Sequence, residues 1–342
     1  MHFPSLHRTF AEEEPPGLCN TMKQVRKTHI GSPARWAWSI AVLVAVAVMG
    51  ACSPGQRHER LRSAYYWSTT FEMDSAKTAF LHDHHIGRLY VRYFDVVPDE
   101  RQGAVPNATI RWKDPVPEAV AGNIVPVVFI LNDCMKGDTS DLAQKIVGRI
   151  LQMNETHDIG RVPEVQIDCD WTASTEQTFF EFLRRVKAEL QPHGIGLSVT
   201  IRLHQLRQAA PPADRGVLMM YNTGDFSDLA DEHPILDMRV ALPYLRHLPD
   251  YPLSLSAAYP LYRWDLLFRG QQFVGILHGD DLPMLAGDSI VVRQPSLDEI
   301  VGARRQLDEV RSDVNNEVIL YELNDYNITR FNSYDYETIF ND

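Results

Sequence analysis

The stretch Val165-Gln166-Ile167-Asp168-Cys169-Asp170-Trp171-Thr172 alternates apolar and polar residues, which is the pattern of a β-strand. Gln166, Asp168 and Asp170 would lie on one face of this strand. The apolar residues and Cys169 would lie on the other. Strands of a parallel sheet covered by helices are buried on both faces and are normally apolar throughout. Buried polar side chains cost free energy unless they are paired or used, so this strand predicts a functional site.

Units of a strand followed by a helix recur along the chain and predict a (β/α)₈ TIM-like barrel. Besides the opening stretch, strands are expected at 65–71, 88–97, 123–131, 197–206, 216–222, 253–259 and 317–323. A hairpin containing 272–277 is expected as an insertion after the seventh strand. An open, doubly wound sheet is the alternative fold. No glycine-rich phosphate loop follows any of the strands, which disfavours the nucleotide-binding versions of that alternative.

The helices of these units have recognisable starts. Ser174 with Gln177, and Ser296 with Glu299, have the spacing of a capping box, in which each side chain bonds the other residue's backbone. Further helices are expected at 74–85, from about 139, and at 334–340.

The N-terminal region has the pattern of a secretory signal peptide. Basic residues at 23–27 precede an apolar run from Trp36 to Met49, and Gly50-Ala51-Cys52 follows. The run is shorter than the roughly 20 residues that span a bilayer. The segment resembles a bacterial lipobox, although Met49 stands where leucine is usual. The resemblance implies that Cys52 is lipidated and anchors an exported protein to a bacterial membrane, on its periplasmic or outer-membrane face.

An ordinary secreted protein with an incidental Cys52 remains the alternative. Residues 1–21 fit no targeting pattern, so we expect translation to start at Met22. The predicted organisation is an N-terminal extension and signal peptide at 1–51, a tether at 52–62 and a single barrel domain at 63–342. Inside the barrel, Cys134 and Cys169 could form one disulfide or remain two buried thiols.

The net charge of −12 argues against a nucleic-acid partner. Polar residues gather at the predicted C-terminal ends of the strands, where the active sites of such barrels lie. Carboxylates among aromatic rings suit a sugar, which has hydroxyls at its edge and CH groups on its face. The candidate residues are Asp168, Asp170 and Tyr221 for catalysis, and Trp67, Arg202, His204, Asn222, Tyr259, Trp264 and Glu322 for substrate binding.

Asp168 and Asp170 are two residues apart, which places their Cα atoms roughly 6.6 Å apart along a strand. Two like charges this close raise the pKa of one carboxyl, and a nearby Arg202 would lower that of the other. Such a pair can supply both an acid and a base. The alternative is an Asp–Arg network that fills the barrel interior without catalysis.

Two of these motifs resemble the family 18 glycoside hydrolases, the chitinase-like barrels. Their fourth strand carries Asp-x-x-Asp-x-Asp-x-Glu, of which Asp168 and Asp170 match the second and third Asp. Their sixth strand carries Met-x-Tyr-Asp, matched here by Met219-x-Tyr221. This chain has Val165 in place of the first Asp, Asn222 in place of the last, and Thr172 where the family has its catalytic Glu. The resemblance therefore implies that Asp170, or a carboxylate from another strand such as Glu322, would have to donate the proton, or that the barrel is not a hydrolase.

A broader resemblance links the chain to a family of bacterial lipoproteins of unknown function. It rests on the segments 166–172, 200–205 and 218–224 and runs over most of the chain after Cys52. It implies membership and no reaction.

The sequence thus predicts a lipid-anchored barrel that binds, and hydrolyses, a carbohydrate. Asp170 would be the general acid or stabilise the transition state, with Asp168 tuning it and Arg202 setting their charge. Tyr221 and Asn222 would hold the substrate, and Trp264 would stack on a sugar. No cofactor or metal is expected. A non-catalytic glycan-binding or cell-envelope scaffold protein is the rival interpretation, because Thr172 lacks an acidic group.

Overall fold

The computed structural model describes residues 60–277 and 284–341. The predicted signal peptide, Cys52 and most of the predicted tether lie outside the described residues. The first strand begins at Leu61, so the last two positions of that tether belong to the barrel.

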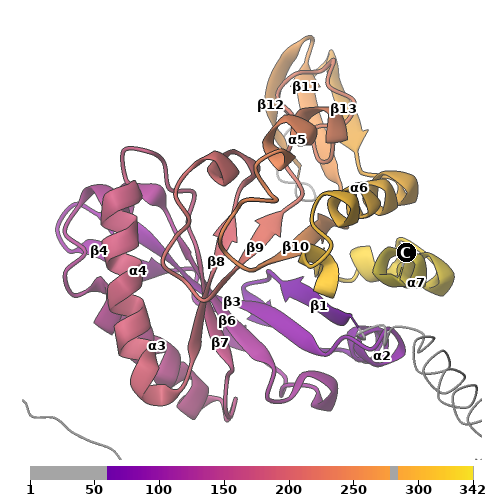
Figure 1. Ribbon diagram of the computed structural model, residues 1–342. Coiled ribbons are helices and arrows are strands. Elements are labelled where there is room, and N and C mark those ends of the chain that lie inside the picture. The colour runs from indigo at the N-terminus through magenta and orange to yellow at the C-terminus, as the bar shows by residue number, and fades with distance from the viewer. Residues whose placement is uncertain (1–59, 278–283, 342) are drawn as a thin grey trace, which may run out of the picture. The chain divides into compact units, whose positions relative to one another are not determined.

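Eight parallel strands close into a barrel (Figure 1), as the sequence predicts. Each strand pairs with the next, and the first strand pairs with both the second and the last, which closes the ring. Around the ring the strands are β1 (Leu61–Tyr66), β3 (Arg88–Asp99), β6 (Ile124–Ile130), β7 (Glu164–Asp168), β8 (Gly196–Ile201), β9 (Arg215–Met219), β10 (Leu255–Pro260) and β14 (Glu317–Tyr321). A ninth strand, β4 (Gly103–Asn107), pairs antiparallel with the end of β3.

Helices connect most of the strands. They are α2 (Ser75–Asp83), α3 (Leu142–Thr156), α4 (Glu176–Leu190), α5 (Met238–Leu245), α6 (Leu297–Val310) and α7 (Ser333–Asn341). Helices α3 and α4 pack side by side on the outside of the barrel (Figure 1). The capping box of Ser296 and Glu299 is confirmed at the start of α6. The one predicted at Ser174 is wrong, because Thr175 is the N-cap of α4 and its hydroxyl donates to Asn132.

Short 3₁₀ helices complete the connections. They are η1 (Glu118–Val120), η2 (Asn132–Lys136), η3 (Gln191–His193), η4 (Leu203–Arg207), η5 (Val314–Asn316) and η6 (Asn327–Thr329). Within the described residues, no helix is long and apolar enough to cross a lipid bilayer.

The predicted insertion after the seventh barrel strand is a small antiparallel sheet. It consists of β11 (Trp264–Arg269), β12 (Gln272–Ile276) and β13 (Asp288–Arg293), with β11 in the middle. The expected hairpin corresponds to β11 and β12, and β13 was not expected. A second small pair, β2 (Thr70–Phe71) and β5 (Arg111–Trp112), shows that the predicted first strand is divided in two.

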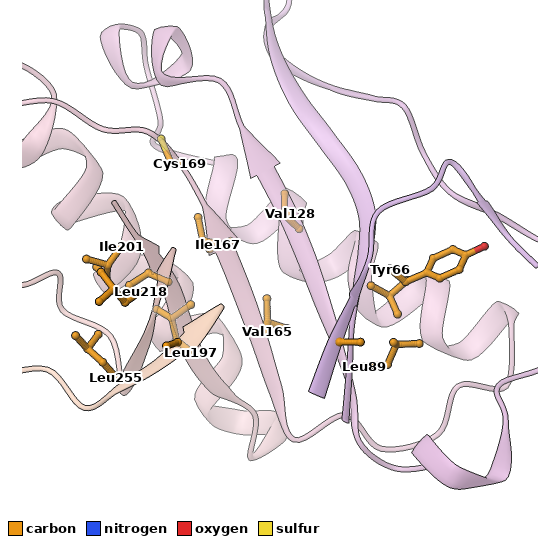
Figure 2. Packing of buried hydrophobic residues seen from close by; sticks show 14 of the residues in the cluster. Tyr66, Leu89, Val128, Val165, Ile167, Cys169, Leu197, Ile201, Leu218 and Leu255 are labelled. Carbon is orange, nitrogen blue, oxygen red and sulfur yellow. The ribbon is translucent and has the colours of Figure 1, made fainter. Parts of the chain in front are cut away.

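Side chains of the barrel strands alternate between two apolar clusters, as a period of two requires. On β7, Val165 and Ile167 belong to the large outer cluster between barrel and helices (Figure 2). Gln166 points inward, where its Oε1 accepts a 2.6 Å hydrogen bond from the Tyr65 hydroxyl. The inner cluster contains Tyr65 and Tyr221. The predicted division of the two faces of this strand is therefore confirmed.

Cys134 and Cys169 are buried free thiols, so the disulfide alternative is not realised. Both lie in the outer cluster, and burial raises the pKa of Cys134 to about 11.

A network of buried charges occupies the barrel interior at the N-terminal ends of the strands. Glu317, the first residue of β14, accepts hydrogen bonds from Ser63 at 2.6 Å, from Ser256 at 2.8 Å and from Arg215. Arg88 lies 3.4 Å from the same carboxylate. Burial alone would raise the pKa of Glu317, but the two guanidinium groups hold it below its usual value. Most of the charged groups at this end of the interior are therefore paired.

Replacing Glu317 by alanine should lower the free energy of unfolding by about 3–5 kcal/mol, because Arg88 and Arg215 would both lose this buried carboxylate, and Arg215 would keep Glu164, 3.6 Å away, as its carboxylate partner. Urea unfolding followed by circular dichroism measures the change. Glu189→Ala, at an exposed position of α4, is the matched control and should be nearly neutral. Equal stability of the two variants would show that the network does not hold the barrel together.

Candidate functional site

A cleft of about 660 Å³ opens at the C-terminal ends of the barrel strands. This is the end where the sequence places the site. The predicted residues that line it are Trp67, Asp168, Asp170, Arg202, Tyr221, Asn222, Trp264 and Glu322. Side chains from the first and last strands of the barrel and from its middle strands therefore line one cleft.

Arg202, the residue after β8, joins the acidic pair. Its Nε donates to Asp170, and its Nη2 lies 3.8 Å from Asp168. Its Nη1 also contacts the sulfur of Met219 at 2.7 Å. The guanidinium thus fixes both carboxylates in place at the floor of the cleft.

The two aspartates differ in their exposure to solvent. Asp168 is only 2% exposed, whereas the side chain of Asp170 is 54% exposed. The Thr200 hydroxyl donates to Asp168 at 2.6 Å. Burial raises the pKa of Asp168, and Arg202 and Thr200 only partly oppose that rise. Asp168 is therefore a buried support, and Asp170 is the member of the pair that a ligand can reach.

The motif at the end of β9 also reaches the cleft. The Tyr221 hydroxyl lies 3.1 Å from Met219 Sδ, and burial raises the pKa of that hydroxyl. Asn222 has a left-handed backbone with φ of 55°, a conformation that asparagine adopts more readily than most residues. Its Oδ1 accepts a hydrogen bond from the Tyr262 hydroxyl.

Glu322 follows β14 and brings a second carboxyl group to the mouth. Around the ring, β7 and β14 are four strands apart in either direction, so Glu322 and Asp170 come from opposite strands. The Asn324 amide donates to Glu322 at 3.1 Å. Burial raises the pKa of Glu322, opposed by that hydrogen bond and by Arg92. Glu322 therefore has the environment of a carboxyl that holds its proton to higher pH than usual.

Aromatic rings form one wall of the cleft. Trp67 and Tyr321 have centroids 5.8 Å apart, Tyr321 and Tyr262 are 5.7 Å apart, and Tyr262 and Trp264 are 5.5 Å apart. Sequence reasoning missed Tyr262 and Tyr321. Both could have been found from their neighbours in the sequence. Tyr321 directly precedes Glu322, and Tyr262 is two residues before Trp264.

Two predicted residues do not line the cleft. Tyr259 is fully buried in the outer cluster, where its hydroxyl donates to Asn315 at 2.7 Å, so its assignment to substrate binding is corrected. The alternation of β10 turns Ala258 inward and Tyr259 outward. His204 is exposed on η4, outside the lining of the cleft. Burial, although partial, lowers its pKa, with Asp170 opposing.

The predicted strand 165–172 ends early, at Asp168. Trp171 is consequently buried against Phe179 and Phe180 of α4 and not in the cleft. Thr172 is exposed, and its hydroxyl lies 2.9 Å from Ser174 Oγ. The position where the resembled family has its acid therefore offers no acidic group here. Among the described residues, no group of three or more His, Cys, Asp or Glu side chains is arranged to hold a metal ion.

Solved structures share this architecture at low sequence identity. The spore cortex-lytic enzyme SleL of Bacillus cereus has a TM-score of 0.53 and 14% identity, covering 82% of this chain and 73% of its own. SleL of Bacillus megaterium has a TM-score of 0.54 and 12% identity, and the match covers 84% of this chain and 75% of that enzyme. A chitinase from Chromobacterium violaceum has a TM-score of 0.54 and 13% identity, and the match covers 82% of this chain and 98% of the chitinase. These similarities show a chitinase-like barrel fold.

No family model matches the sequence, and no curated protein is significantly similar to it.

Replacing Arg202 by methionine should raise the pKa of Asp168 further, because the guanidinium is the main group that opposes the effect of burial. Infrared titration of ¹³C-labelled aspartate carboxyls measures the shift, with Asp168→Asn identifying the band. Arg101→Met, at an exposed position, is the control. An unchanged or lower Asp168 pKa would contradict the assigned role of Arg202.

Proposed function

We propose that the barrel binds a carbohydrate chain across its mouth and hydrolyses a glycosidic bond there. The observation that carries this proposal is the pair of carboxyls from opposite strands. Asp170 is exposed and ion-paired with Arg202, whereas Glu322 has a raised pKa, and both line the same aromatic cleft. Two carboxyls in different environments, one on each side of the bond, are what glycoside hydrolysis requires.

The charges of the cleft favour an uncharged ligand. Three arginines line it, and each already donates to a carboxylate: Arg92 to Asp95 at 2.7 Å, Arg202 to Asp170, and Arg263 to Asp265 at 2.8 Å. An anionic substrate would have to displace one of these pairs. The wall formed by Trp67, Tyr321, Tyr262 and Trp264 offers apolar faces for the CH groups of sugar rings.

In this proposal Glu322 is the general acid. It donates its proton to the bridging oxygen as the bond from that oxygen to the anomeric carbon breaks. Asp170 accepts from Arg202 and so presents its carboxylate as a negative group to the positive charge that develops on the sugar. Water completes the reaction by adding its oxygen to the anomeric carbon and giving a proton to the Glu322 carboxylate, which restores the acid. Asp168 and Arg202 hold Asp170 in position.

The fold adds support, because barrels of this architecture include a chitinase. Oligosaccharides of N-acetylglucosamine, the unit of chitin, are therefore the first substrates to test. Labelled oligosaccharides of other sugars belong in the same panel.

Glu322→Gln should lower the rate of cleavage by roughly 10²–10⁴-fold while oligosaccharide binding is kept, because the amide is similar in size but cannot donate a catalytic proton. Turnover of labelled oligosaccharides and calorimetric binding measure the two properties. Asp170→Asn should show the same separation of turnover from binding, and Glu189→Gln on the surface should have no effect. Full cleavage by the Glu322→Gln variant would remove Glu322 from the mechanism.

The pH profile tests the same assignment. A general acid works in its protonated form, so kcat/KM should fall as pH rises through the raised pKa of Glu322. The free energy of unfolding should change in the same direction. Because burial raises the pKa of Glu322 in the folded protein, the stability that this carboxyl contributes is lost as pH rises through the folded-state pKa.

A non-catalytic glycan-binding protein is the second candidate. Thr172 favours it, because its side chain is not an acid and is turned toward Ser174. This candidate predicts binding in the cleft with no turnover by the unmodified protein.

We also propose, from the sequence alone, that Cys52 carries a lipid that anchors the barrel to a bacterial membrane. Cys52→Ser should then move the protein from the detergent phase to the aqueous phase in a Triton X-114 partition, because no acyl chains remain to hold it. Ser53→Ala is the control and should stay in the detergent phase. A Cys52→Ser protein that still partitions with detergent would contradict the anchor.

A further inference from the structure

A second hollow adjoins the cleft on the side of α6. It has a volume of about 530 Å³ and lies between the segment 294–297, at the start of α6, and the segment 326–331, around η6. We call it the α6 hollow. Tyr326 lines both the cleft and the α6 hollow, so the two adjoin at this residue.

Tyr326 has the properties of a fixed aromatic platform. The residue is 44% exposed. The Arg263 guanidinium lies 4.8 Å from its ring centroid and donates to its hydroxyl at 3.3 Å. The same hydroxyl donates to Gln294 Oε1 at 3.4 Å, which links the platform to the other wall of the α6 hollow. Arg263 thus covers one face of the ring and holds its hydroxyl, while much of the residue remains exposed to a ligand.

The loop that carries Tyr326 is held from below. Lys77 of α2 pairs with Asp325, and the Asn327 backbone amide donates to Asn324 Oδ1 at 2.8 Å. The Asn327 side chain donates to the Glu322 carbonyl at 2.9 Å, which connects this loop to the residue of the proposed acid. A platform ordered in advance costs a ligand less conformational entropy on binding.

The lining of the α6 hollow suits an uncharged sugar. Its one cation, Arg330, already donates to the backbone carbonyls of Leu261, at 2.6 Å, and of Pro295. Phe331 provides a second ring, with the Arg330 guanidinium 4.6 Å from its centroid. Gln294 and Thr329 are exposed polar side chains that can bond hydroxyl groups.

We infer that the α6 hollow is a further sugar-binding site for the same glycan chain that occupies the cleft, with Tyr326 as the ring over which the chain passes. This inference rests on the proposed function. It makes the ligand a polymer or a long oligosaccharide that extends past the reacting bond, and not a disaccharide that fits within the cleft.

The test compares chain lengths. The Glu322→Gln protein, which should bind without cleaving, is titrated calorimetrically with N-acetylglucosamine oligosaccharides from the disaccharide to the hexasaccharide. The affinity should increase with length. Adding Tyr326→Ala should reduce the affinity for the hexasaccharide roughly tenfold, as truncation of an aromatic anchor does, and the ratio of hexasaccharide to disaccharide affinity should fall by a similar factor.

Two further variants make the result specific. Tyr326→Phe keeps the ring and should keep most of the length dependence. Tyr334→Ala removes a tyrosine of α7 that is 78% exposed and lines neither hollow, and it should change nothing.

Three outcomes would overturn the inference. An affinity that does not increase with length, or a Tyr326→Ala variant that loses affinity equally for every length, would do so while leaving binding in the cleft intact. Absence of binding for every oligosaccharide, with turnover also absent in the unmodified protein, would overturn the proposed function and the inference together.

Discussion

Arg202 is the residue on which the arrangement of the mouth depends. Two carboxylates two positions apart at the end of one strand repel each other, and one of them is buried. A guanidinium that reaches both allows Asp168 to support Asp170 from below. Without that group, the buried carboxyl would have to keep its proton or leave the interior. The acidic pair is therefore possible because β8 lies next to β7, which brings Arg202, just after the end of β8, to both aspartates.

The two ends of the barrel interior satisfy the same requirement in different ways. At the N-terminal ends of the strands, Glu317 is surrounded by arginine and serine donors, and that end is filled. At the C-terminal ends, Asp170 keeps one side toward solvent, and Glu322 is bonded to Asn324. Paired charges in the first place stabilise the fold. The carboxyls in the second line an open cleft and are available to a ligand, and this difference in exposure distinguishes the site from internal packing.

Much of the barrel could be predicted because its signals are local and periodic. The alternation of Val165 and Ile167 with Gln166 and Asp168 gave the correct faces. Errors occur where the period of two ends. Because β7 stops at Asp168, the chain turns and Trp171 packs on α4. Residues after a strand cannot be assigned to a face by counting, which is why Tyr262 was missed. Tyr321, the last residue of β14, follows the alternation with Ile319 and could have been found by it.

Tyr259 was misassigned for a different reason, since its chemistry suggested the cleft while its position on β10 faces it outward. Glu322 and Asp170 line the same cleft because their strands lie opposite each other in the barrel. No local sequence pattern contains that order of strands. Sequence therefore located the mouth of the barrel and most of its polar residues. Only the closed barrel shows which of these residues lie opposite each other across the mouth.

In the proposed mechanism, Glu322 and Asp170 act on opposite sides of one glycosidic bond. The most direct measurement is a crystal structure of the Glu322→Gln protein with a bound N-acetylglucosamine hexasaccharide. We predict a bridging oxygen within hydrogen-bond distance of the side chain at position 322 and the adjoining anomeric carbon facing Asp170. A chain bound elsewhere, or one in the cleft whose bridging oxygens all lie out of reach of position 322, would show that Glu322 is not the general acid.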